Sequence, residues 1–137
     1  MSEKTIPRLV QPASLKAAAQ AAVRQGHPLV VMTTLQGCPF CDVVRERFLQ
    51  PALAAGRLFA VQVDIRDRQT PLQDFQGNTR TGAEITSQWK ARFAPTVLFL
   101  DAQGRELTER LVGVAVADFY EDYLWQHIAQ AQRKLAQ

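Results

Sequence analysis

The chain has 137 residues, is 47% hydrophobic and carries a formal net charge of +3 from 16 basic and 13 acidic residues. This length suits one domain with its own core, and the dispersed charges argue against a basic arm that binds nucleic acid. No apolar run approaches the about 18 residues that a membrane-spanning helix needs, so we expect no membrane insertion.

The first elements expected along the chain are a helix and a buried strand. Apolar residues recur at helical spacing over residues 14–25, with Ser14 placed to cap the helix and Gly26 to end it. Residues 28–34 are apolar and rich in β-branched side chains, which is typical of a strand buried on both faces.

A second helix and a second strand are expected next. Apolar positions recur at helical intervals from Cys41 to Gly56, although Pro51 should bend or break this helix. Residues 58–65 are mostly apolar and predict a second core strand. This part of the chain is therefore interpreted as a β-α-β unit.

Residues 66–81 show no clear periodicity and are interpreted as an insertion. Their turn residues at 74–78 favour a small hairpin. Thr81 and Glu84 match a capping box, which predicts a short helix that continues through Phe93.

The last elements expected are two strands and a helix. Residues 94–100 and 105–112 predict strands that pair as a hairpin across a short turn. Residues 116–135 predict an amphipathic helix, with Phe119 and Tyr123 among its apolar positions. The alternation of helices and strands indicates an α/β fold.

Both cysteines of the chain lie in one run, Gly37-Cys38-Pro39-Phe40-Cys41, between an expected strand and an expected helix. Unpaired N–H groups and the positive helix end favour thiolate over thiol on Cys38, and Pro39 suits the first helical position. Cys41 lies one turn further on and is placed to resolve a mixed disulfide. We therefore expect Cys38 and Cys41 to be the catalytic residues of a thiol-disulfide oxidoreductase.

The cysteine pair has three alternative interpretations. Zinc normally takes four ligands, and the chain offers in addition only His27 and His127, neither in knuckle-like spacing. Two incidental buried cysteines are a further alternative, which the strand-to-helix context disfavours. A binding module that delivers copper is the alternative from another class, because soft thiolates suit Cu(I). We expect no resident metal and no organic cofactor.

Together with Phe93-Ala94-Pro95-Thr96-Val97 at the start of a later strand, the cysteine run resembles the thioredoxin superfamily. The resemblance implies a thioredoxin fold: a central mixed sheet of about four strands flanked by helices, with an N-terminal helix and the small insertion at about 66–81. It implies a single domain over residues 1–137 with its core at about 28–130. It also makes Pro95 the cis-proline that packs against the dithiol.

The expected substrate groove follows from the same resemblance and consists of Pro39, Phe40, Ala94 and Pro95. Phe40 could alternatively pack internally rather than dock an apolar substrate segment. Phe40 also offers no charge or hydrogen bond to a thiolate, unlike the histidine of strong oxidants in this family. That difference favours the reductase direction.

Within the superfamily, the chain is similar to thioredoxin-like proteins of periplasmic disulfide reduction and sulfur oxidation, through the cysteine run and residues 74–77 and 95–104. This implies a disulfide-containing protein as substrate and a reducing partner, for which the group's usual source is a membrane electron transporter. The first residues show no secretory signal. The resemblance favours a periplasmic protein whose signal is absent from this sequence, with a cytoplasmic protein as the alternative.

Three features depart from thioredoxin itself. Gly37 replaces the tryptophan before the first cysteine, Pro39-Phe40 replaces Gly-Pro between the cysteines, and Met32 replaces the buried acid six residues before the first cysteine. An apolar side chain at Met32 cannot accept a proton from Cys41. The proton acceptor for Cys41 is not identified by the sequence.

Overall fold

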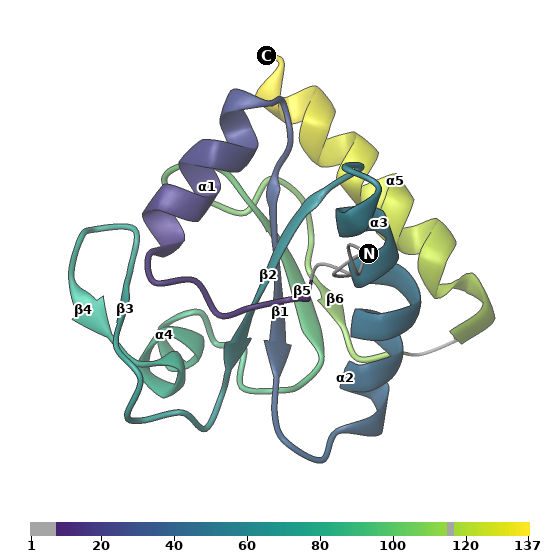
Figure 1. Cartoon of the computed structure of the whole chain (residues 1–137). Coiled ribbons are helices and arrows are strands. Elements are labelled where there is room, and N and C mark those ends of the chain that lie inside the picture. The colour runs from purple at the N-terminus through teal and green to yellow at the C-terminus, as the bar shows by residue number, and fades with distance from the viewer. Residues whose placement is uncertain (1–7, 115–116) are drawn as a thin grey trace, which may run out of the picture.

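The computed structural model describes residues 8–114 and 117–137. Within these residues the central sheet has four strands, namely β1 (Leu29–Thr34), β2 (Phe59–Asp64), β5 (Thr96–Leu100) and β6 (Leu111–Val112). The strand order is β2-β1-β5-β6. Strand β1 pairs in parallel with β2 and antiparallel with β5, which pairs antiparallel with β6 (Figure 1). The expectation of a mixed sheet is confirmed.

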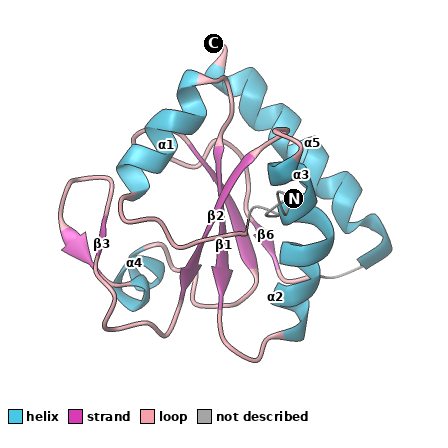
Figure 2. Ribbon diagram, viewed as in Figure 1, coloured by secondary structure: helices cyan, strands magenta, loops and turns pink. Residues whose placement is uncertain are grey.

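Helices cover both faces of this sheet (Figure 2). They are α1 (Leu15–Arg24), α2 (Pro39–Val43), the π-helix η1 (Val44–Leu49), α3 (Gln50–Ala54), α4 (Gly82–Gln88) and α5 (Ala117–Leu135). The segments α2, η1 and α3 follow one another directly and form the cysteine helix, residues 39–54. The cysteine helix and α5 pack on one face, and α1 and α4 pack on the other.

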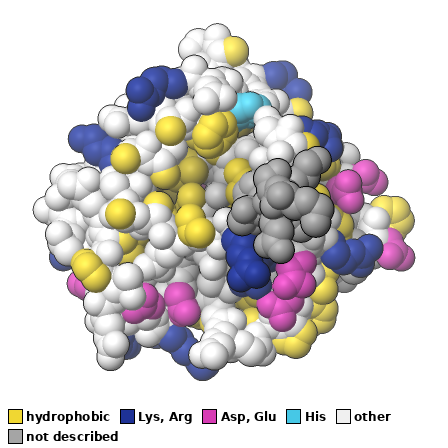
Figure 3. All heavy atoms as spheres, viewed as in Figure 1, with side chains coloured by type: hydrophobic (Ala, Val, Ile, Leu, Met, Phe, Trp, Pro, Cys, Tyr) yellow, Lys and Arg dark blue, Asp and Glu magenta, His cyan; other side chains and the backbone are white. Residues whose placement is uncertain are grey.

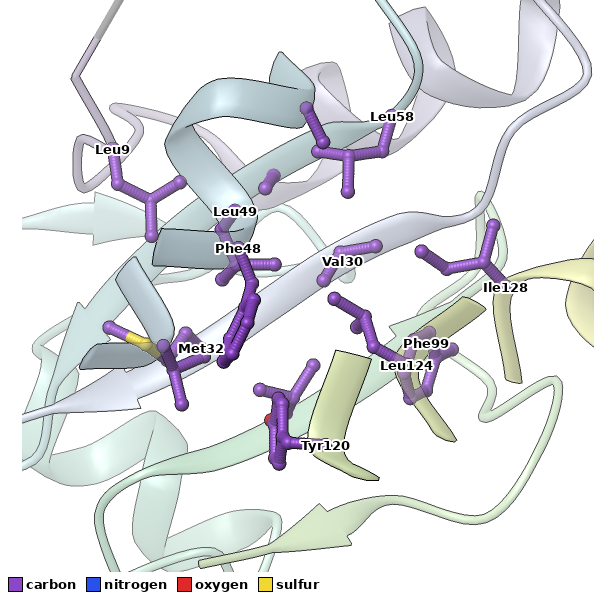
Figure 4. Close-up of a cluster of buried hydrophobic side chains, with 14 of the residues drawn as sticks. Leu9, Val30, Met32, Phe48, Leu49, Leu58, Phe99, Tyr120, Leu124 and Ile128 are labelled. Carbon is purple, nitrogen blue, oxygen red and sulfur yellow. The ribbon is translucent and has the colours of Figure 1, made fainter. Parts of the chain in front are cut away.

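Strand β1 divides the core into two apolar clusters. All of its residues are buried, as expected for a central strand. Val30 and Met32 face the cluster under the cysteine helix and α5, which Figure 4 shows, whereas Leu29 and Val31 face the cluster under α1 and α4. This alternation follows from the two-residue period of a strand.

The helix expected at residues 14–25 is confirmed. The Ser14 side chain accepts a hydrogen bond from the N–H of Ala17 at 3.1 Å, and Gly26 follows the helix with a φ of 80°. The segment before α1 closes the outer edge of β2. There the N–H of Gln62 donates to the carbonyl oxygen of Val10 at 2.9 Å.

Pro51 does not end the cysteine helix. It lies in the first turn of α3, and the chain stays helical on both sides of it. Directly before it, η1 has π-helical hydrogen bonds, so that the N–H of Gln50 reaches the carbonyl oxygen of Arg45. A change in hydrogen bonding, not a break, accommodates a residue that has no N–H to donate.

The hairpin expected in the insertion is confirmed. Strands β3 (Leu72–Gln73) and β4 (Thr79–Arg80) pair antiparallel. The Asp74 carboxylate accepts hydrogen bonds from the N–H groups of Gln76 and Asn78, which fixes the turn between them. The capping box of Thr81 and Glu84 is also present and begins α4.

The expected continuation of α4 through Phe93 is wrong. The helix ends at Gln88, because Lys90 adopts a left-handed φ of 54° and the N–H of Ala91 turns back to the carbonyl oxygen of Thr86 at 2.8 Å. Phe93 therefore lies in a loop, and its side chain is 60% exposed.

The strand expected at residues 105–112 is shorter than predicted. Only Leu111–Val112 pair with β5 as a strand, apart from an isolated bridge at Glu106. Before β6, the guanidinium of Arg110 donates to the Glu106 carboxylate and to the carbonyl oxygen of Trp89. In this stretch the N–H of Leu107 still donates to the carbonyl oxygen of Phe99 at 2.7 Å, without forming a continuous strand.

Helix α5 buries a narrower stripe than predicted. Tyr120, Leu124 and Ile128 are buried, whereas Phe119 and Tyr123, also among the expected apolar positions, are about half exposed, at 56% and 50%. The expected first residue of this helix, at position 116, lies outside the described residues. No helix in the described parts of the chain is long and apolar enough to cross a membrane.

Candidate active site

The two cysteines meet at the junction of a loop and the cysteine helix. Cys38 is the N-cap of α2 in an extended conformation, and Pro39 occupies the first turn. A disulfide joins Cys38 to Cys41, with 5.3 Å between their Cα atoms. The N–H of Cys41 points at the Cys38 sulfur at 3.2 Å. A thiolate on Cys38 would accept this same N–H at the positive end of the helix.

The two sulfurs differ in exposure. Cys41 is 0% exposed and belongs to the apolar cluster that includes Met32 and Val44, whereas Cys38 is half-buried. An incoming molecule can therefore reach Cys38 first. Met32 is fully buried in the same cluster, so the position of the missing acid is occupied by an apolar side chain.

A loop faces the dithiol from the other side. The peptide bond between Ala94 and Pro95 is cis, and the Cys38 sulfur lies 3.8 Å from the carbonyl oxygen of Ala94. Pro95 is buried, and Ala94 is half-buried. The structure thus brings together the residues that the resemblance assigned to the groove, with Phe40 and Pro39 on the helix side.

Threonine hydroxyls fix this loop. The Thr33 hydroxyl donates to the carbonyl oxygen of Phe93 at 2.9 Å and accepts the N–H of Thr96 at 2.8 Å. The Thr96 hydroxyl donates to the same Phe93 oxygen at 2.6 Å. Both threonines are almost fully buried. Sequence reasoning missed the role of Thr33, for which the signal is a hydroxyl in a central strand that is buried on both faces.

Exposed apolar side chains border the dithiol and its facing loop. Phe40 is 58% exposed, so internal packing of this ring is not what the structure shows. Phe93 is 60% exposed and Val112 is 59% exposed. The N–H of Gly113 donates to the carbonyl oxygen of Pro95 at 2.7 Å, which holds β6 against the loop.

Gly113 lets the Phe93 ring lie directly on the backbone. Its φ is 67°, and a Cβ placed there would lie 3.3 Å from an edge carbon of Phe93. Any side chain at this position would therefore press on the ring as well as strain the backbone. Sequence reasoning placed Phe93 on a helix and did not identify this contact.

One ion pair lies on the cysteine helix. The Asp42 side chain is 60% exposed and its carboxylate binds the guanidinium of Arg45 at 2.8 Å. Figure 3 shows basic and acidic side chains interspersed on the face it presents. Mixed surface charge of this kind provides no extended field of one sign.

The histidines have partners away from the cysteine run. His127 hydrogen-bonds through Nδ1 to the carbonyl oxygen of Tyr123 at 2.7 Å, and His27 contacts Gln132. Among the residues that the structure describes, no group of three or more His, Cys, Asp or Glu side chains is arranged to hold a metal ion.

Comparison with known proteins identifies this fold. The chain aligns with thioredoxin O2 from Arabidopsis thaliana in the oxidized state at a TM-score of 0.60 and 16% identity, covering 92% of this chain and 99% of that one. It aligns with thioredoxin NaTrxh from Nicotiana alata at a TM-score of 0.59 and 18% identity, covering 93% of this chain and 99% of that one. With the DsbH oxidoreductase the TM-score is 0.58 and the identity 20%, and the alignment covers 94% of this chain and 91% of that one. The expected thioredoxin fold is confirmed.

Residues 15–128 match a family described as a thioredoxin-like domain. The chain therefore belongs to this family and to the thioredoxin superfamily. A search of curated proteins finds no significant match. Family membership and the Cys38–Cys41 disulfide together support a thiol-disulfide oxidoreductase.

Proposed function

We propose that the protein reduces disulfides of protein substrates through Cys38 and Cys41. The observation that carries the proposal is the asymmetry of the pair. Cys38 is half-buried at a helix N-cap, while Cys41 is 0% exposed behind it. Cys38 is thus suited to attack a large partner, and Cys41 is suited to complete the exchange within the molecule.

The exchange transfers two electrons to the substrate. The Cys38 thiolate attacks one substrate sulfur, forms a mixed disulfide and releases the other substrate sulfur as a thiolate. Cys41 then loses its proton and attacks the Cys38 sulfur, which forms the Cys38–Cys41 disulfide and releases the second substrate thiol. Since Met32 cannot take the proton of Cys41, water or the departing substrate thiolate accepts it.

The groove for the substrate is formed by Pro39 and Phe40 on one side and by Ala94 and Pro95 on the other. The exposed rings of Phe40 and Phe93 border it and favour substrates with apolar side chains next to the disulfide. Burial of such side chains against these rings contributes about 25 cal/mol for each Å² removed from water.

The proposal also covers the direction of electron transfer, the partner that re-reduces the cysteine pair and the cellular compartment. Phe40 offers no charge or hydrogen bond to a thiolate, which supports a low reduction potential and hence the reductase direction. The likeness of the cysteine run to periplasmic reductases supports export to the periplasm and re-reduction by a membrane electron transporter.

The deciding experiment measures the reduction potential of the pair and the reduction of insulin disulfides. We expect a potential nearer to the about −270 mV of thioredoxin than to the about −120 mV of strong disulfide oxidants. We expect Cys41→Ser to accumulate mixed disulfides on Cys38, and Cys38→Ser to accumulate none. A potential near that of the oxidants would contradict the reductase direction. If the Cys38–Cys41 pair cannot be reduced and reoxidised, or if Cys41→Ser accumulates no mixed disulfide, the proposed oxidoreductase activity is contradicted.

A further inference from the structure

The side chain of Arg45 ties the cysteine helix to the sheet. Its Nη2 donates to the Thr34 hydroxyl at 2.6 Å, and its Nε donates to the side-chain oxygen of Gln62 at 2.9 Å. Its Nη1 donates to the Asp42 carboxylate at 2.8 Å. One guanidinium therefore links η1 to the end of β1, to β2 and to the residue after Cys41.

This guanidinium is a sheltered charge. The Arg45 side chain is only 18% exposed, whereas that of its partner Asp42 is 60% exposed. Water screens an exposed carboxylate more strongly than a sheltered guanidinium. An arginine also keeps its proton throughout the usual pH range. The position is therefore a fixed positive charge that Asp42 offsets only in part.

The charge belongs to a residue one helical turn beyond Cys41. Arg45 follows Cys41 by four residues on the cysteine helix, and residues at this spacing are neighbours on a helix surface. Thr34 ends β1 four residues before Cys38. Gln62 is the register partner of Met32 in the β1–β2 ladder. Arg45 thus reaches the strand position beside the apolar residue that replaces the buried acid.

We propose that Arg45 is a positioning residue that sets the reduction potential of the Cys38–Cys41 pair. The reduced pair carries a thiolate and the disulfide carries no charge, so a fixed positive charge nearby favours the reduced form. Two of its hydrogen bonds, to Thr34 and Gln62, also tie the cysteine helix to the sheet. This inference rests on the proposed exchange chemistry and adds the group that tunes it.

The test compares the equilibrium of each variant with a glutathione redox buffer. Arg45→Met removes the charge, and we expect the equilibrium to shift towards the disulfide about tenfold, which is about 30 mV to more negative potential. Arg45→Lys keeps the charge but loses the fork of donors, so its shift should be smaller. Asp42→Asn removes the offsetting charge and should shift the equilibrium the opposite way.

The matched control is Arg47→Met, which makes the same charge change on the same helix, where Arg47 lies over the ring of Phe48. We expect its equilibrium constant to stay within twofold of the parent.

A merely structural role would lower stability without shifts of opposite sign for Arg45→Met and Asp42→Asn. Equal shifts for Arg45→Met and Arg47→Met, or a shift of Asp42→Asn in the same direction as Arg45→Met, would overturn the proposal. If Arg45→Met does not fold, the direction of the Asp42→Asn shift decides. The reductase proposal, by contrast, fails on the potential of the parent protein and not on differences between variants.

Discussion

The two sides of the dithiol are built differently. The helix side is one continuous segment, residues 39–54, which buries apolar side chains such as Phe48 and Leu49 under it. The loop side is assembled from separate parts of the chain, since Thr33 holds Phe93 from 60 residues away and Gly113 holds Pro95 from β6. The helix side therefore depends on burial, and the loop side depends on a few polar contacts.

Among the changes that test this difference, removal of the Thr33 hydroxyl should have the largest effect on stability. Thr33→Val leaves the buried N–H of Thr96 without its acceptor, so we expect the free energy of unfolding to fall by about 1–3 kcal/mol. Thr33→Ser keeps the hydroxyl and is the matched control. Urea unfolding and insulin reduction should both show Thr33→Val as the weaker variant. Equal stability of the two variants would show that burial, not the hydroxyl, holds the loop side.

A methyl group at Gly113 should have the next largest effect. Gly113→Ala forces alanine into a φ of 67°, and Gly26→Ala forces it into 80° where nothing lies within 4 Å. We expect each to lose about 1–2 kcal/mol of unfolding free energy from backbone strain. Only Gly113→Ala should also slow disulfide reduction, because it displaces the Phe93 ring. If both variants reduce disulfides at the parent rate, Phe93 and Gly113 do not contribute to substrate binding.

The smallest effect is expected for Tyr120, whose ring packs against Phe48 of the helix side. The Tyr120 hydroxyl is buried without a hydrogen-bond partner among the described residues, and its ring stacks on Phe48 at 5.5 Å. Tyr120→Phe keeps the ring and removes the hydroxyl, so we expect unchanged or higher stability at neutral pH, by up to about 1 kcal/mol. Tyr123→Phe, at an exposed position of α5, should leave it unchanged.

The pH dependence of stability checks the same residue. Burial raises the pKa of Tyr120 above its ordinary value of 10.0. As pH rises past that value, the unfolded chain releases a proton that the folded protein retains, so the stability of the parent falls. Tyr120→Phe should lack this part of the fall in unfolding experiments between neutral and alkaline pH. Identical pH dependence in both proteins would contradict the burial of this hydroxyl.

The starts of the helices could be predicted because their signals are local. The Ser14 cap, the capping box at Thr81 and the cysteine run all act within a few residues, and each lies where the sequence indicates. The loop side could not be predicted in detail. The end of α4 depends on a left-handed Lys90, a conformation that favours glycine, and the exposure of Phe93 follows from it.

The short final strand also escaped prediction. Periodicity predicts which residues alternate, but it indicates neither where ladder pairing begins nor that the guanidinium of Arg110 binds the carbonyl oxygen of Trp89 from 21 residues away. The tether from Arg45 to Thr34 and Gln62 escaped prediction for the same reason.

The segment before α1 has a consequence for how the molecule behaves in a crowded solution. Its pairing with Gln62 covers backbone groups on the outer strand β2, where another chain could otherwise add as a further strand. The segment therefore disfavours edge-to-edge aggregation on that side of the sheet. A chain shortened to begin at Ser14 would lose this cover, together with the buried Leu9 side chain that packs in the cluster under the cysteine helix.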